Sequence, residues 1–198
     1  EYLTEQVPGV ARAHCLAPGP QPGGPSDPKP GQVFVLVLPR TEYPEGRISP
    51  ELLTLSAELR ADVLRNLDQR RLLGTTLEVR QPQYVMVSVQ ATLRVPERSH
   101  AALLREVEDE AERALYRYLN PYVGGPWGTG WPFGRDLHLP EVYGVLQRVP
   151  AVEFVEDVQI SIQDSETATD RRPVDMRLTL PPHAVVCSGL HRVAVIAR

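Results

Sequence analysis

The chain has 198 residues, which is enough for one large domain or two small ones, and 42% of them are hydrophobic. Its formal net charge of −4 and a sequence pI of about 5.8 argue against general affinity for nucleic acid. No run reaches the roughly 18 apolar residues of a membrane helix, and no signal peptide is visible. Because the chain begins at Glu1 without a methionine, we expect it to be a piece of a longer protein.

The first part of the chain predicts the end of a helix and then strand, strand, helix, strand. Ser49 and Pro50 favour the start of the helix, as N-cap and first helical residue, and leucines follow at helical spacing. A stretch rich in proline and glycine, residues 17–31, lies between the first two strands and is predicted to be a flexible loop. The predicted elements are a helix at 1–7, strands at 10–16, 33–38 and 75–80, and a helix at 49–67.

The second part predicts a strand, a helix, an irregular loop, a second helix, a strand and a terminal β-element. The strand at 84–95 alternates strictly, with valines and leucine on one face. We expect Ser99 to cap the following helix, and an irregularity near Glu156 and Asp157. The other predicted elements are helices at 99–119 and 139–149, a strand at 152–162, an alternating segment at 176–180, and a hairpin joining 184–187 to 193–197.

Alternating helices, strands and hairpins predict an α+β fold. We expect two small domains, residues 1–81 and 82–198, each a mixed or antiparallel sheet with helices packed on one face.

The segment between the two later helices, residues 119–137, has a composition unlike the rest of the chain. It holds both tryptophans, Trp127 and Trp131, together with Phe133 and five glycines. Glycine and proline exclude a helix, and aromatic residues are scarce in disordered linkers. The sequence therefore predicts an ordered loop, which we call the aromatic loop, pinned by its rings to the domain's own core or to another chain.

An ordered aromatic loop could serve three functions. It lacks the sequence of a phosphate cradle. Tryptophan faces could stack on a sugar, although no pair of carboxylates stands nearby as in glycosidases. An aromatic anchor at a protein interface fits best, and packing within its own domain is an equally good alternative.

Residues for other chemistry are few. The five histidines show no metal-ligand spacing. The acidic run from Glu106 to Glu112 is interspersed with arginines, as on a solvated helix face. Cys187 and His191 form a close cysteine–histidine pair, without a visible third group to orient the base. Cys15 and Cys187 are expected to be buried free thiols. We expect no catalytic residue, no cofactor and no metal, and hence no enzyme.

The sequence of the aromatic loop and of the helix after it resembles that of a known protein family. Leu119-Asn120-Pro121, Gly124-Gly125, Gly130 to Arg135 (Gly-Trp-Pro-Phe-Gly-Arg) and Val142-Tyr143 are similar to the C-terminal region of baseplate J-like proteins, putative baseplate assembly proteins of contractile phage tails and injection systems. The opening Pro8 to Ala13 and the strand start at Pro82 to Val85 agree with that pattern. The chain departs from it at Pro150-Ala151, where the family commonly has glycine, which puts the local turn in doubt.

The resemblance implies a structural role without catalysis. Family members are wedge subunits that link a central hub or spike to the sheath. It implies a hetero-oligomer with other wedge subunits and hub and sheath-proximal proteins, no nucleic acid and no membrane insertion. It also implies assembly in the bacterial cytoplasm and residence in a phage tail or released injection particle. The interface candidates are Trp127, Trp131, Phe133, Arg135, Tyr122 and Tyr143.

Two other hypotheses remain open at this stage. One is a carbohydrate-binding module that uses Trp127 and Trp131 as a stacking platform, and the weaker one is a sensor of small molecules. For the assembly hypothesis, we expect Trp131→Ala to weaken assembly more than folding.

Overall fold

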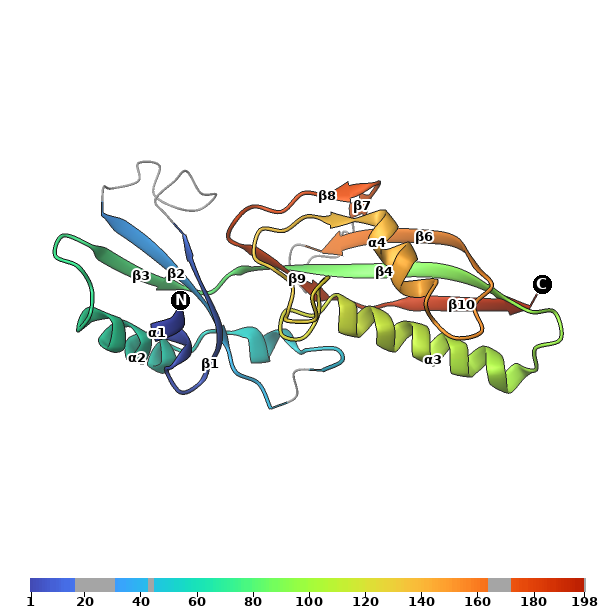
Figure 1. Cartoon of the computed structure of the whole chain (residues 1–198), viewed down its shortest axis with the longest axis horizontal. Coiled ribbons are helices and arrows are strands. Elements are labelled where there is room, and N and C mark those ends of the chain that lie inside the picture. Colours follow the sequence, from blue (N-terminus) through green and yellow to red (C-terminus); the bar gives the residue numbers. More distant parts are fainter. Residues whose placement is uncertain (17–30, 43–44, 164–171, 198) are drawn as a thin grey trace. The chain divides into compact units, whose positions relative to one another are not determined.

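A computed structural model of the chain describes residues 1–16, 31–42, 45–163 and 172–197. The chain divides into two compact units, Glu1–Glu42 with Ser49–Gln83, and Tyr43–Ile48 with Tyr84–Arg198. Figure 1 gives the element labels used below. Most of the expected proline- and glycine-rich excursion, residues 17–30, lies outside the described residues. The expectation that the chain forms two domains divided at residues 81 and 82 stays a prediction.

The first unit is a three-stranded mixed sheet with helices, in the strand order β1-β2-β3. β1 pairs with β2 in antiparallel orientation, and β2 pairs with β3 in parallel orientation. The elements are α1 (Tyr2–Glu5), β1 (Val10–Leu16), β2 (Gln32–Pro39), the 3-10 helix η1 (Pro50–Leu53), α2 (Ala57–Asp68) and β3 (Thr76–Arg80).

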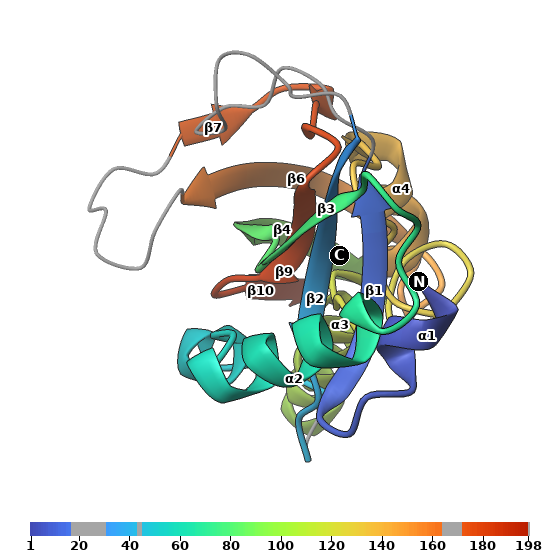
Figure 2. The same ribbon diagram turned by 90° about the vertical axis from the view of Figure 1, so that its left-hand side faces the viewer.

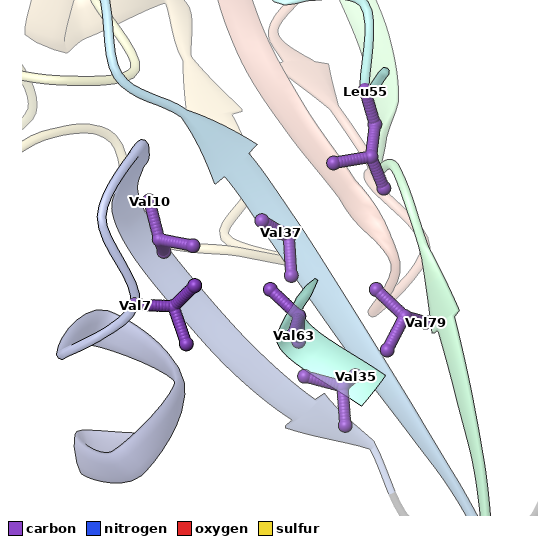
Figure 3. Close-up of a cluster of buried hydrophobic side chains, with 7 residues drawn as sticks. All are labelled: Val7, Val10, Val35, Val37, Leu55, Val63 and Val79. Carbon is purple, nitrogen blue, oxygen red and sulfur yellow. The ribbon is translucent and has the colours of Figure 1, made fainter. Parts of the chain in front are cut away.

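The core of this unit lies between the sheet and its helices. Figure 3 shows side chains from α2 and from all three strands pointing toward one another. α2 turns its apolar face toward the sheet, and Val63 on that face is completely buried. The buried cluster is Val7, Val10, Val35, Val37, Leu55, Val63 and Val79.

The helix predicted at 49–67 is divided in two, and of the apolar residues predicted at helical spacing Leu52 alone leaves the core. Thr54 has an extended backbone (φ −76, ψ 125), which ends η1. The α-helix begins after Ser56, whose hydroxyl accepts a hydrogen bond from the N–H of Leu59 at 3.1 Å. Ser56 therefore supplies the cap that the sequence suggested for Ser49. As a result, Leu52 lies off the core and is half exposed.

The second unit is a mixed sheet with two helices. Its main sheet has the order β10-β4-β6-β7, β9 also pairs with β4, and β5 pairs with β8 in a separate two-stranded ladder. The elements are β4 (Gln83–Val95), α3 (Ala101–Tyr118), β5 (Leu137–His138), α4 (Leu139–Leu146), β6 (Phe154–Gln163), β7 (Arg172–Val174), β8 (Arg177–Leu178), β9 (Ala184–Ser188) and β10 (Arg192–Ala197).

β4 is the central strand of this sheet, and its predicted alternation is confirmed at its C-terminal half. Val89 and Leu93 are completely buried, whereas Gln90 on the opposite face is exposed. α3 contacts β10 and α4, and α4 contacts β6; Figure 2 shows the two helices on the same side of these strands. The predicted irregularity is confirmed, because the register shifts where Thr92 faces Asp157 and Leu93 faces Val155.

The predicted terminal hairpin is wrong. β9 and β10 each pair with β4, and β10 runs parallel to it. Between the two strands the chain bends against β4, where the N–H of Gly189 donates to the carbonyl oxygen of Val87 at 2.7 Å. A Cβ on Gly189 would lie 2.5 Å from the hydroxyl oxygen of Ser88 and 3.2 Å from the carbonyl oxygen of Val87, so the side chain of Ser88 would have to move to admit a larger residue.

These layers confirm the predicted α+β class. A second helix cap also differs from the prediction: α3 is capped by His100, whose Nδ1 accepts from the N–H of Leu103 at 3.0 Å, and not by Ser99. Among the described residues, no helix combines the length and the hydropathy that crossing a bilayer requires.

Candidate functional site

The aromatic loop leaves the C-terminal end of α3 and is closed on itself by backbone hydrogen bonds. The N–H of Trp131 donates to the carbonyl oxygen of Asn120 at 2.9 Å. The N–H of Gly130 donates to the carbonyl oxygen of Gly124 at 2.9 Å. These bonds join the two ends of the loop, so it is an ordered structure, as the sequence predicted.

Asn120 organises the start of the loop. Its side chain is buried, and its Oδ1 accepts hydrogen bonds from the N–H groups of Tyr122 at 2.7 Å and Val123 at 3.1 Å. This is the pattern by which an asparagine side chain stands in for a backbone turn. Its backbone oxygen also accepts from Gly124 at 3.1 Å. Asn120 therefore uses both its side chain and its main chain to end α3 and begin the loop.

Gly124 lets the loop cross the end of α3 at close range. A Cβ at this position would lie 2.4 Å from the carbonyl oxygen of Tyr118 and 2.6 Å from that of Arg117. These are backbone atoms of the last helical turn and have little freedom to move. The close approach allows the N–H of Gly125 to donate to the Tyr118 oxygen at 2.7 Å.

Trp131 is part of the core and not of the surface. It is 0% exposed, and its indole Nε1–H donates to the carbonyl oxygen of Arg135 at 3.0 Å. Its ring meets the edge of Tyr118 with centroids 5.5 Å apart at 88°, a favoured aromatic geometry. The hypothesis that Trp131 offers its ring to a partner is therefore corrected, because the chain itself covers the whole ring.

Arg135 joins the loop to α4. Its guanidinium carbon lies 5.2 Å from the centroid of the Trp131 ring, and its NH1 and NH2 groups donate to the two carboxylate oxygens of Glu141 at 3.2 and 2.5 Å. Partial burial would raise the pKa of Glu141, but the hydrogen bonds from Arg135 and from the N–H of His138 outweigh it and hold the pKa below its ordinary value. Arg135 thus makes its contacts within the chain and connects Trp131 to the first turn of α4.

Trp127, unlike Trp131, lies at the surface. It is 72% exposed, at the tip formed by residues 126–129, all of which are exposed. The tip is a tight turn in which the N–H of Gly128 donates to the carbonyl oxygen of Gly125 at 3.3 Å. Both glycines have positive φ, of 70° and 75°, which other residues adopt at a cost. An exposed indole is therefore presented on a short turn whose base is fixed by the bonds described above.

The remaining interface candidates are half-buried. Phe133, Tyr122 and Tyr143 each keep part of their surface in solvent. Burial is the main cause that raises the pKa of the Tyr122 hydroxyl above its ordinary value. The stacking platform suggested for a carbohydrate needed two exposed indoles, and only Trp127 is exposed, so the structure does not form it.

A depression of about 470 Å³ lies beside the tip of the loop, between α3 and α4. Its floor is apolar and its rim carries both signs of charge, from Glu110, Arg117 and Arg148. A partner with an apolar side chain and a charged neighbour would fit such a surface. The lining residues are Glu110, Ala114, Arg117, Tyr118, Val123, Gly124, Gly125, Gly128, Val145, Arg148, Val149 and Pro150.

The cysteine–histidine pair of the sequence is sealed in the core. Cys187 and His191 are each 2% exposed. Burial raises the pKa of the Cys187 thiol, and burial together with the charge of Arg47 lowers the pKa of His191 to about 3. At neutral pH the thiol stays protonated and the imidazole neutral, so this pair supplies no thiolate. Cys15 is half-buried, and both cysteines are free thiols.

Two of the acidic residues of α3 make contacts within the second unit. Glu110 pairs with Arg113 at 3.0 Å, and Glu108 accepts from the N–H of Val195 at 3.3 Å. Among the described residues, no group of three or more histidine, cysteine, aspartate or glutamate side chains is arranged to hold a metal ion.

Comparison with known proteins gives a structural likeness but no match in sequence. No protein-family model and no curated protein sequence matches the chain. Among solved structures, the chain is similar to a protein of the anti-feeding prophage baseplate, determined by cryo-EM with 6-fold symmetry. The TM-score is 0.54 and the identity 16%, and the match covers 94% of this chain and 35% of that chain. The likeness shows a shared fold, and the chain spans about a third of the length of the protein that it matches.

Sequence reasoning missed the residues that hold the loop in place. Asn120 stood before Pro121, a pair typical of turn initiation, and this signal could have marked it. Glu141 follows Pro140 in the first turn of α4, where an acidic capping residue is expected. No local signal identifies Asp136, which accepts from the N–H of Leu180 at 2.8 Å and pairs with Arg177 on β8, because these contacts join segments about forty positions apart.

Proposed function

We propose that this chain is a structural component of the baseplate of a contractile tail or injection system, and that it acts by binding other proteins. The observation that carries this proposal is the fold shared with a protein of the anti-feeding prophage baseplate over 94% of the chain. A likeness to an isolated domain of general use would cover one unit, whereas this match covers most of both.

The finer assignment is a wedge subunit that links the hub or spike to the sheath. It is supported by the resemblance of the aromatic loop to the baseplate J-like pattern, and in particular by Gly130 to Arg135. Because the chain spans 35% of the protein that it matches, a longer protein would carry the complete set of contacts.

Within this function, Trp127 is the proposed contact residue. Large aromatic side chains supply much of the binding energy at protein interfaces, especially beside a pocket that excludes water. Trp127 lies on a turn whose base is fixed by Gly125 and Gly128, next to the depression between α3 and α4. Because little freedom remains to be lost at this turn, ordering it on binding costs little free energy.

The experiment is co-purification of the tagged chain, within its full-length protein, with the other proteins of the baseplate. Trp127→Ala is compared with Tyr2→Ala, which removes an aromatic ring of the same 72% exposure from the first unit. We expect Trp127→Ala to fold normally and to lower the recovered partners by about tenfold or more, which corresponds to roughly 1.4 kcal/mol. Tyr2→Ala should recover them as the unchanged protein does.

Two results would count against the proposal at different levels. If Trp127→Ala recovers the same partners in the same amounts, Trp127 is not the anchor, while the baseplate role stands. If the unchanged protein is absent from purified baseplates and binds none of their proteins, the baseplate role itself is wrong.

A further inference from the structure

The depression beside the tip of the aromatic loop carries an excess of positive charge. The charged residues of its lining are one glutamate, Glu110, and two arginines, Arg117 and Arg148. Glu110 also pairs at 3.0 Å with Arg113, which lies outside this lining, so its charge is partly balanced there. The rim of the depression therefore favours a negatively charged partner.

The two arginines at the rim are not engaged within the chain. In the part of the chain that the structure describes, neither Arg117 nor Arg148 makes a hydrogen bond or an ion pair, and both are exposed. Arg135 of the same unit differs, because its guanidinium donates to both carboxylate oxygens of Glu141. A guanidinium whose planar set of donors is open to solvent is suited to bind a carboxylate.

Both arginines lie near the C-terminal end of a helix, where a positive charge can also act as a cap. The helix ends at this depression, however, have backbone partners for their carbonyl oxygens. The oxygen of Tyr118 accepts from the N–H of Gly125 at 2.7 Å, and the oxygen of Val145 accepts from the N–H of Arg148 at 3.3 Å. Neither guanidinium donates to these oxygens, so both side chains remain available to a partner.

The floor of the depression is apolar and partly open to solvent. Ala114, Tyr118 and Val123 line it, and each keeps part of its surface exposed. The volume of about 470 Å³ lies in the range of sites that bind ligands. The exposed ring of Trp127 follows Gly125 and precedes Gly128, which both line the depression. An apolar side chain of a partner would therefore find apolar contacts between the loop and α3.

A neighbouring depression has the opposite balance of charge. It has a volume of about 480 Å³, shares Glu110 and Pro150 with the first, and continues along α3 toward Leu103. Its charged residues are two glutamates, Glu106 and Glu110, and one arginine, Arg113. A carboxylate is thus attracted to one part of this surface and repelled from the next, which restricts where an acidic segment can bind.

We propose that the depression beside Trp127 binds a segment of another protein in which a large aliphatic side chain stands between two carboxylates. The aliphatic side chain would enter the depression, and the carboxylates would pair with Arg117 and Arg148 at its rim. Trp127 would add aromatic contact area beside the bound side chain. That the partner is another protein rests on the proposed function, whereas its chemistry follows from the lining of the depression.

The test uses a peptide and does not need baseplates. The probe is a capped peptide with leucine between two glutamates, added to the 198-residue chain and followed by NMR. The indole N–H of Trp127 and the amide of Gly128 report binding. The amides of Leu72 and Leu73, which are exposed in the first unit, report non-specific contact with apolar peptides. One control peptide has lysine in place of both glutamates, and the other has alanine in place of leucine.

We expect the resonances of Trp127 and Gly128 to shift, with half-saturation at about 1 mM peptide, and those of Leu72 and Leu73 to stay in place. The lysine peptide should not bind, because its charge has the sign of the rim. The alanine peptide should bind about fivefold more weakly or worse, because it buries less apolar surface.

Charge reversal tests the two arginines separately. Arg117→Glu and Arg148→Glu should each weaken binding of the glutamate peptide about fivefold, as the loss of an exposed charge pair does. Arg105→Glu is the matched control: it changes the net charge equally at an exposed residue of α3 outside the lining, and binding should stay unchanged. Added salt should weaken binding to the unchanged protein.

Four results would overturn the inference. They are unshifted resonances of Trp127 and Gly128 up to about 10 mM peptide, equal binding of the lysine peptide, unchanged binding by both charge-reversal variants, and shifts that grow with protein concentration without peptide. The last would mean that a second copy of the chain is the occupant.

The failure of this inference can be told apart from the failure of the proposed function. A chain that joins baseplates but does not bind the peptide keeps the assembly role and loses the acidic partner. A chain that binds the peptide but joins no baseplate keeps the binding site and loses the proposed function.

Discussion

The guanidinium carbon of Arg135 lies 5.2 Å from the centroid of the Trp131 ring, and the backbone oxygen of Arg135 accepts the hydrogen bond of the same indole. One residue thus satisfies both the face and the polar edge of a buried tryptophan. Its charge is in turn held by Glu141 on α4. The aromatic loop is therefore built into the second unit through Trp131 and Arg135, whereas its tip around Trp127 is exposed.

This arrangement predicts opposite roles for the two tryptophans. Trp131→Ala removes a fully buried ring and leaves a cavity, so we expect the free energy of unfolding to fall by about 3–5 kcal/mol. Trp127→Ala removes an exposed ring and should change it by no more than about 0.5 kcal/mol. Urea unfolding followed by circular dichroism measures both. Equal losses of stability would contradict the assignment of Trp131 to the core.

The two tryptophans also show where sequence reasoning stopped. Both lie in a loop without periodicity, so no pattern assigns either ring to a buried or an exposed face. The strictly alternating segment of β4 did allow such an assignment, and Val89 and Leu93 are buried as expected. Composition was enough to predict an ordered loop, but the direction of each ring depends on contacts with Tyr118 and Arg135.

The pairing of β9 and β10 with β4 also could not be predicted from the sequence. β9 and β10 were recognised as strands from their apolar runs, and their short separation suggested a hairpin. The bend at Gly189 instead returns the chain to β4, because His191 accepts the N–H of Val89 at 3.2 Å and Gly189 bonds Val87. These contacts span about a hundred positions, and a local pattern cannot encode them.

Two glycine substitutions should have opposite effects. Gly124→Ala would bring a Cβ within 2.4 Å of the Tyr118 oxygen, so we expect a loss of more than about 2 kcal/mol of stability. Gly144→Ala places the same methyl group in open space on α4, where alanine favours the helix by about 0.5–1 kcal/mol. Thermal unfolding of the two variants compares them directly. A stabilised Gly124→Ala would show that the loop does not pass this close to α3.

The turn at Ala151 offers a stabilising substitution. The N–H of Val152 donates to the carbonyl oxygen of Val149 at 3.3 Å, and Ala151 between them has φ of 68°. With Pro150 before it, this is the geometry of a type II turn, which favours glycine at the position of Ala151. Alanine at this position is therefore under local backbone strain.

We expect Ala151→Gly to raise the free energy of unfolding by up to about 1.5 kcal/mol. Relief of the left-handed conformation gains roughly 1–2 kcal/mol, and the greater freedom of glycine in the unfolded chain offsets about 0.4–1 kcal/mol of it. The melting temperature measures the balance. Gly144→Ala serves as the reverse substitution, and a lower melting temperature for Ala151→Gly would exclude strain at this turn.

The last prediction concerns the loss of stability at acidic pH. His191 is buried, and burial with the nearby charge of Arg47 lowers its pKa from 6.5 to about 3. Above pH 6.5 the histidine is neutral in both states and its contribution to stability is complete. As the pH falls from 6.5 toward 3, the unfolded chain takes up a proton that the folded chain refuses. This one group then lowers the free energy of unfolding by up to about 1.4 kcal/mol per pH unit.

His191→Gln removes this proton linkage. The variant should be less stable at neutral pH by about 1–3 kcal/mol, because the N–H of Val89 loses its acceptor. Its stability should then fall less steeply than that of the unchanged protein between pH 6.5 and 3. Urea unfolding across this range gives the slopes. Parallel curves for the unchanged protein and His191→Gln would mean that the buried imidazole takes up a proton in the folded state as readily as in the unfolded one.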